Sequence, residues 1–88
     1  MTVRAILHIF VESGKLEDVG EALAKIPEII DVYEVSGEYD LIATAKANDL
    51  HKLRSLISER LMKMHGIKAV TTFVLLHTYK LNGKEVFE

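Results

Sequence analysis

The hydrophobic and polar positions of the chain follow two rhythms, one typical of strands and one typical of helices. From Val3 to Val11 the run VRAILHIFV is apolar on both alternating sets of positions, which indicates a central strand covered on both faces. Residues 16–26 then place apolar side chains every three or four positions, with charged residues between them, as an amphipathic helix does. Pro27 is expected to end this helix, because proline lacks the amide hydrogen that helix continuation needs.

A hairpin is predicted next. Strands are expected over Ile29–Val35 and Tyr39–Ala47, because both runs are rich in β-branched and apolar residues. The segment Ser36-Gly37-Glu38 between them is a turn signal, since serine and glycine favour turn conformations.

The rest of the chain predicts a second helix and a fourth strand. Asn48 or Asp49 is expected to cap the helix, and Gly66 is a good terminating residue. The fourth strand is expected over Ala69–Tyr79, with a short polar tail over residues 80–88.

The element order β-α-β-β-α-β predicts an α+β fold of the ferredoxin-like type, with both helices on one face of a four-stranded antiparallel sheet. A shift of 38 residues supports it, because the apolar positions of 19–32 then align with those of 57–70. The other sheet face is also apolar in three of the strands, and a two-fold dimer is the simplest cover for it. We therefore expect one domain over residues 1–88 in a dimeric α/β barrel-type assembly.

Composition narrows the classes of function. The 88 residues include no cysteine, which excludes disulfides and thiolate metal sites, and no apolar run approaches the length of a membrane span. The net charge is −2, with three Lys or Arg against nine Asp or Glu in residues 1–45, and six against two in residues 46–68. Two helices with complementary charged faces explain this asymmetry better than a nucleic-acid patch does, because no aromatic residues are interleaved with the basic ones.

Catalytic residue types are present without catalytic spacing. His8 and His77 would lie on neighbouring strands, but no third ligand completes a metal site, so we expect no metal and no cofactor. No serine stands in a Gly-x-Ser-x-Gly elbow, and no glycine-rich phosphate loop is present. The sequence therefore does not predict an enzyme.

The turn before the third strand is the most suggestive polar segment. Gly37 permits a positive φ, and free amide groups in a tight turn can hold a carboxylate, while Asp40 can accept from an ammonium group. An ordinary turn in which Asp40 bonds its own backbone is the alternative. Thr71 and Thr72 are adjacent on a strand, so their side chains are expected on opposite faces; both are also simply good strand formers.

Three stretches in this order, Ile26–Val35, Ser36–Leu41 and His65–Leu75, resemble the effector-binding domain of the Lrp/AsnC family, the feast/famine transcription regulators. This domain is also called the RAM domain. The resemblance covers roughly residues 3–80. The turn Gly-Glu-Tyr-Asp and the Thr-Thr strand fit this family better than they fit the amino-acid-binding ACT domains, which have a similar architecture.

The resemblance implies an amino-acid effector and an oligomer. Such domains dimerise sheet against sheet, and the dimers join into rings, which are commonly octamers. Effectors sit between dimers, near the turn and the fourth strand. Carried over to this chain, the ligand-binding residues are Gly37, Glu38, Tyr39, Asp40, Thr71, Thr72 and Phe73.

The chain departs from the family pattern at its start. Typical members carry a helix-turn-helix of roughly 50 or more residues before this domain, and here the first strand begins at Val3. We therefore expect a stand-alone cytoplasmic domain for transcription regulation that binds no DNA directly and associates with full-length Lrp/AsnC regulators. A small dimeric α+β barrel enzyme and a ligand-free assembly module are the alternative functions.

Overall fold

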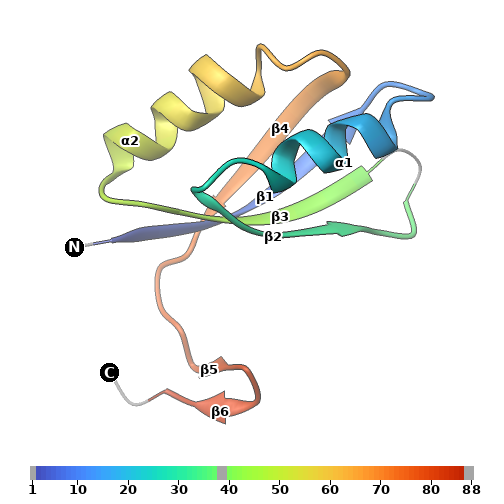
Figure 1. Ribbon diagram of the computed structural model, residues 1–88. Helices are drawn as coiled ribbons and strands as arrows, with labels where there is room; N and C mark the ends of the chain where they lie inside the picture. The colour runs from blue at the N-terminus through green and yellow to red at the C-terminus, as the bar shows by residue number, and fades with distance from the viewer. Residues whose placement is uncertain (1, 38–39, 87–88) are drawn as a thin grey trace.

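The computed structural model describes residues 2–37 and 40–86 (Figure 1). Its elements follow the predicted order. They are β1 (Val3–Val11), α1 (Leu16–Ala24), β2 (Ile29–Glu34), β3 (Asp40–Ala47), α2 (Leu50–Ser55), the π-helical segment η1 (Leu56–Leu61), β4 (Ile67–Val74), and the short strands β5 (Lys80–Leu81) and β6 (Lys84–Glu85).

The main sheet has the strand order β2-β3-β1-β4, and all neighbouring strands are antiparallel. Both helical segments cover the same face of this sheet (Figure 1). The predicted α+β, ferredoxin-like fold is therefore confirmed. The strand β1 is central as expected: its Leu7 pairs with Ala43 of β3 on one side and with Thr72 of β4 on the other.

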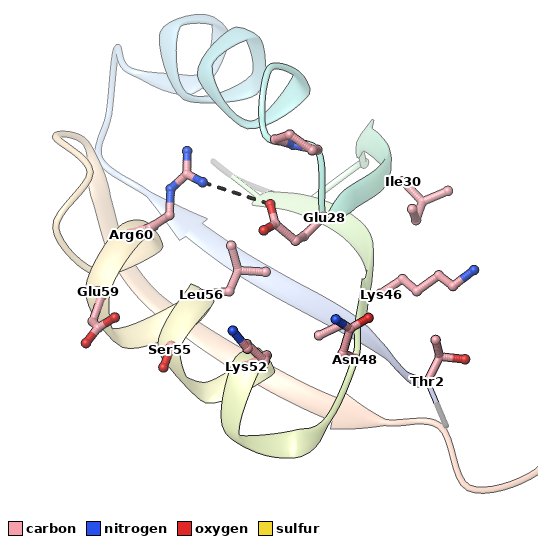
Figure 2. Close-up of a pocket in the computed structure, with 12 residues that line it drawn as sticks. Thr2, Glu28, Ile30, Lys46, Asn48, Lys52, Ser55, Leu56, Glu59 and Arg60 are labelled. Carbon is pink, nitrogen blue, oxygen red and sulfur yellow. Dashed lines mark ion pairs between the residues drawn. The ribbon is translucent and has the colours of Figure 1, made fainter.

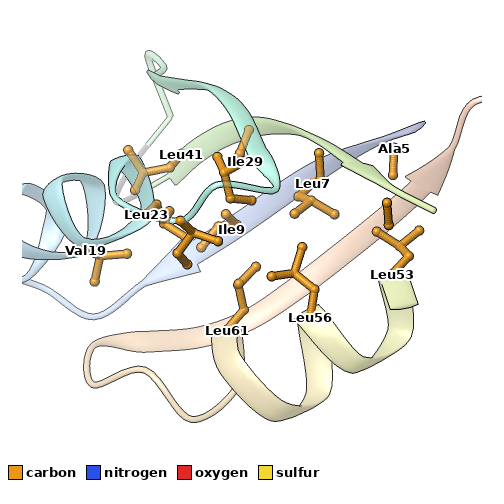
Figure 3. Close-up of a cluster of buried hydrophobic side chains, with 14 of the residues drawn as sticks. Ala5, Leu7, Ile9, Val19, Leu23, Ile29, Leu41, Leu53, Leu56 and Leu61 are labelled. Carbon is orange, nitrogen blue, oxygen red and sulfur yellow. The ribbon is translucent and has the colours of Figure 1, made fainter. Parts of the chain in front are cut away.

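The core lies between the sheet and the helices (Figure 3). Alternate residues of β1 and β3 point into it because side chains on a strand alternate between the two faces. Leu23 from α1 and Leu61 from η1 contact these side chains from the helix side and are completely buried. Among the described residues, no polar side chain is buried in this core, so burial of apolar surface is the main stabilising term.

The first helix ends earlier than predicted. It stops at Ala24, and the amides of Lys25 and Ile26 donate to the carbonyls of Ala22 and Leu23, each three residues back. Such tight final turns are common at helix ends. The position of Pro27 explains the early stop, because the residue before a proline is disfavoured in the helical conformation.

The second helix changes geometry in its middle. Asp49 is the N-cap and its carboxylate accepts from the amide of Lys52 at 2.8 Å, as the cap signal predicted. After Ser55 the helix widens into η1, where the amide of Met62 donates to the carbonyl of Ile57. The sequence pattern alone did not predict this π-helical segment.

The fourth strand is displaced from its predicted bounds. It begins at Ile67 and ends at Val74, and just beyond it the amide of Leu75 donates to the carbonyl of Arg4. The remaining chain forms the β5–β6 hairpin, which extends away from the sheet on the side opposite the helices (Figure 1). Leu76 in this arm is 93% exposed.

Candidate functional site

The sheet face opposite the helices, which we call the open face, carries both apolar and polar side chains. The strand register assigns its residues. They are Arg4, Ile6, His8 and Phe10 of β1, Asp31 and Tyr33 of β2, Asp40, Ile42, Thr44 and Lys46 of β3, and Ala69, Thr71 and Phe73 of β4. Phe73, on the edge strand β4, is 54% exposed, so this face leaves a large aromatic side chain in contact with solvent.

Asp40 lies where the predicted binding turn enters β3. Its side chain is only 17% exposed. The carboxylate folds back over Gly37, and a Cβ atom at Gly37 would overlap Asp40 Oδ2. Gly37 does not adopt a positive φ. The absence of a side chain at Gly37 therefore leaves room for this position of the Asp40 carboxylate, and the conformational reason expected from the sequence is wrong.

His8 joins this turn to the centre of the open face. Its Nε2 atom lies 3.7 Å from Asp40 Oδ1, and its ring stacks on Phe10 with the ring centres 4.1 Å apart. The Nε2 atom is buried and makes no hydrogen bond within the part of the chain that the structure describes. The sequence pattern did not predict that His8 lies close to Asp40.

The predicted residues of the fourth strand separate onto two faces. Thr71 pairs with His8 and Phe73 pairs with Ile6, so both lie on the open face. Thr72 pairs with Leu7 and therefore faces the helices. The opposite orientation of the two threonines is as predicted.

The structure therefore brings part of the predicted site together. Asp40 and Thr71 belong to strands on either side of His8, and Gly37 adjoins Asp40. Glu38 and Tyr39 lie outside the described residues. His8 is the addition that sequence reasoning missed, because only the strand order places it between β3 and β4.

Metal ligands are not gathered at this site. The described residues contain no group of three or more His, Asp or Glu side chains placed to hold a metal ion. His77 lies beyond the end of β4 and packs edge-on against Tyr79, so it is not a strand neighbour of His8 as the sequence suggested. No helix in residues 2–37 and 40–86 is long and apolar enough to cross a membrane.

The order of elements and the four-stranded antiparallel sheet define a small α+β domain of the ferredoxin-like type. The family model described as the Lrp/AsnC ligand binding domain matches residues 4–84. The chain belongs to this family, which is regulatory and not enzymatic. The enzyme alternative is thereby set aside.

Individual relatives agree with this assignment. The chain is 30% identical over 76 residues to the HTH-type transcriptional regulator FL11 of Pyrococcus horikoshii, a match that covers 86% of this chain and 50% of that protein. The crystal structure of FFRP-DM1 superposes with a TM-score of 0.80 at 34% identity, covering 84% of this chain and 99% of the other. The chain spans about half the length of the curated relatives it matches.

A more distant structure shares the fold. The complex of the transcriptional regulator NMB0573 with L-Met, from Neisseria meningitidis, superposes with a TM-score of 0.81 at 18% identity. The match covers 90% of this chain and 53% of that chain.

Proposed function

We propose that this chain senses a free amino acid, which binds at the turn ending in Asp40 and at the adjoining part of the open face. The observation that carries the proposal is the placement of Asp40. A carboxylate that is largely shielded from water, yet not buried in the core, is well placed to accept a hydrogen bond from an ammonium group.

Each candidate residue has a role in this proposal. The backbone amides of the turn from Gly37 through Glu38 and Tyr39 hold the carboxylate of the ligand. Asp40 orients its amino group. Thr71 supplies a hydroxyl on the open face.

Two further candidate ligand-binding residues of the fourth strand, Phe73 and Thr72, lie on opposite faces of the sheet. Phe73, on the open face, offers an apolar surface to the side chain of the ligand. Thr72 faces the helices, so its proposed contribution is to fix the strand rather than to touch the ligand.

Relatives support an amino acid as the ligand class. The family model is that of a ligand-binding domain, and the NMB0573 structure, which shares the fold, is a complex with L-Met. The proposal is limited to the class of amino acids and does not name methionine, because the side chains that contact the ligand can differ at 18% identity.

The open face is proposed to pack against a second copy. It exposes Phe10 and Phe73, and an apolar surface of this kind gains stability when it is removed from water. The β5–β6 arm projects beyond this face (Figure 1), so it would lie alongside the partner. Such dimers are proposed to join into a ring, with an octamer as the expected size.

The proposed partners follow from the family. Residues 1–88, with a net charge of −2, are proposed to sense and assemble and not to bind operator DNA, since DNA-binding surfaces are usually basic. Association with full-length Lrp/AsnC regulators, in the cytoplasm, would connect amino-acid binding to transcription.

Calorimetric titration with each of the twenty amino acids tests the proposal. We expect one or a few to bind, and Asp40→Ala to weaken that binding about tenfold or more, because it removes a charged hydrogen-bond acceptor. Asp18→Ala is the matched control, since Asp18 is an exposed carboxylate on α1 and should leave the affinity unchanged. Heat of binding from none of the twenty would favour the ligand-free assembly module.

A further inference from the structure

A cavity of about 520 Å³ opens on the helix side of the sheet, at the end of β3 far from Asp40. Glu28 in the turn before β2 and Ile30 near the start of β2 form one wall, and the helical segments α2 and η1 form the other (Figure 2). Leu56 lies between the two walls. The volume falls within the range of about 300–1,000 Å³ that is typical of small-molecule sites.

Cationic groups from the helical wall flank the centre of this cavity. Arg60 and Lys52 lie on either side of Leu56 (Figure 2). Arg60 Nη1 is 3.9 Å from Glu28 Oε1, and both side chains of this pair are about half exposed. The pair is therefore weak, and the guanidinium keeps donors available for another acceptor.

The remaining charges favour an anion as the ligand. The formal charges of Glu28 and Arg60 offset each other, so the charge of Lys52 decides the balance. Lys52 forms no ion pair with any residue in the described ranges. Glu59 and Lys46, which also line the cavity, point away from Leu56 in Figure 2. The accessible charge at the centre is thus positive.

Apolar side chains complete the lining. Leu56 and Ala47 are buried and form the base of the cavity, while Ile30 is 57% exposed on its wall. Pro27 extends this apolar surface. A fully hydrated ion such as phosphate would leave these groups uncovered, whereas a ligand with an apolar body would bury them.

One of the two cations, Arg60, lies on the irregular part of the second helix, whereas Lys52 lies on its regular α-helical part. The π-helical segment η1 begins at Leu56 and includes Arg60. Segments of this kind are rare and occur frequently at functional sites, because the extra residue per turn redirects side chains. This observation is independent of the cavity and lies at the same place.

We propose that this cavity binds a small organic acid with an apolar body. Arg60 and Lys52 hold its carboxylate, and Leu56 and Ile30 contact its apolar body. The cavity is on the opposite sheet face from His8, so the site is separate from the proposed amino-acid site. An amino acid is disfavoured here because its ammonium group would face the two cations.

Equilibrium dialysis with radiolabelled benzoate tests this proposal. We expect saturable binding with a dissociation constant of about 1 mM, which is reasonable for a ligand of this size. Unlabelled 3-methylbutanoate should displace benzoate. Benzamide has nearly the same shape without the charge and should not displace it.

Variants locate the binding. Arg60→Gln and Lys52→Gln should each weaken benzoate binding about three- to tenfold, through loss of a charged hydrogen bond. Arg54→Gln is the matched control, because Arg54 is exposed on the same helix and does not line the cavity. Thermal unfolding followed by circular dichroism confirms that each variant folds; all three replaced side chains lie on the surface.

The outcomes separate this site from the proposed amino-acid site. Binding that survives Asp40→Ala and is weakened by Arg60→Gln supports the proposal, whatever the amino-acid titrations show. The proposal is overturned if benzoate does not bind, or if Asp40→Ala weakens benzoate binding while Arg60→Gln does not. It is also overturned if inorganic phosphate displaces benzoate at the same concentrations as 3-methylbutanoate.

Discussion

At the scale of single residues, the proposed amino-acid site depends on the contact between Gly37 and Asp40. A methyl group at Gly37 would meet the end of the Asp40 side chain, not the backbone. Because that side chain can rotate away, we expect Gly37→Ala to change the free energy of unfolding by less than about 1 kcal/mol. It should nevertheless weaken amino-acid binding, since the carboxylate is moved.

A double-mutant cycle measured by calorimetry checks this expectation. The variant carrying both Gly37→Ala and Asp40→Ala should bind no more weakly than Asp40→Ala alone, because both changes act through the same carboxylate. Gly14→Ala is the control: its φ of +83° makes alanine strained, at a cost of about 1 kcal/mol, but it should leave the affinity unchanged. Additive losses in the double variant would show that Gly37 acts independently of Asp40.

The sequence anticipated some of these residues and not the relation between them. The turn, the aspartate after it and the opposite orientation of Thr71 and Thr72 follow from local patterns, because turn signals and strand alternation are local properties. The approach of His8 to Asp40 depends on which strands are neighbours. No spacing along the chain encodes that pairing.

At the scale of elements, the start of the second helix was predicted from the sequence, and its π-helical segment was not. Its start was predicted because a cap is a local hydrogen bond, made here by Asp49 to the amide of Lys52. Its π-helical segment was not, because an apolar stripe fits an α-helix equally well. Both Leu56 and Leu61 are buried in the structure, so packing against the sheet accompanies the wider turn.

The cap supports a prediction about stability. Asp49→Ala should lower the free energy of unfolding by about 1 kcal/mol, because the amide of Lys52 loses its acceptor. Urea denaturation measures the change. Asp49→Ser is the matched control and should restore most of the loss, since serine is also a good N-cap. Equal stability of the alanine and serine variants would show that the cap contributes little.

At the scale of the whole molecule, the open face and the arm are the surfaces that the isolated chain leaves uncovered. The helices cover only one face of the sheet (Figure 1). Phe73 on the other face and Leu76 in the arm are both exposed. The sequence predicted the apolar open face from alternation, but not the arm, because the strand-like run of residues 69–79 gives no local sign that β4 ends at Val74.

Light scattering after size exclusion, with and without each of the twenty amino acids, tests the central claim most directly. The account predicts a particle of dimer size or larger whose mass or thermal stability changes with one or a few amino acids. Phe73→Glu should yield monomers, because it places a charge in the proposed interface. Met62→Glu, at an exposed apolar position outside the sheet, should not. A wild-type monomer, or a particle indifferent to all twenty amino acids, would contradict the account.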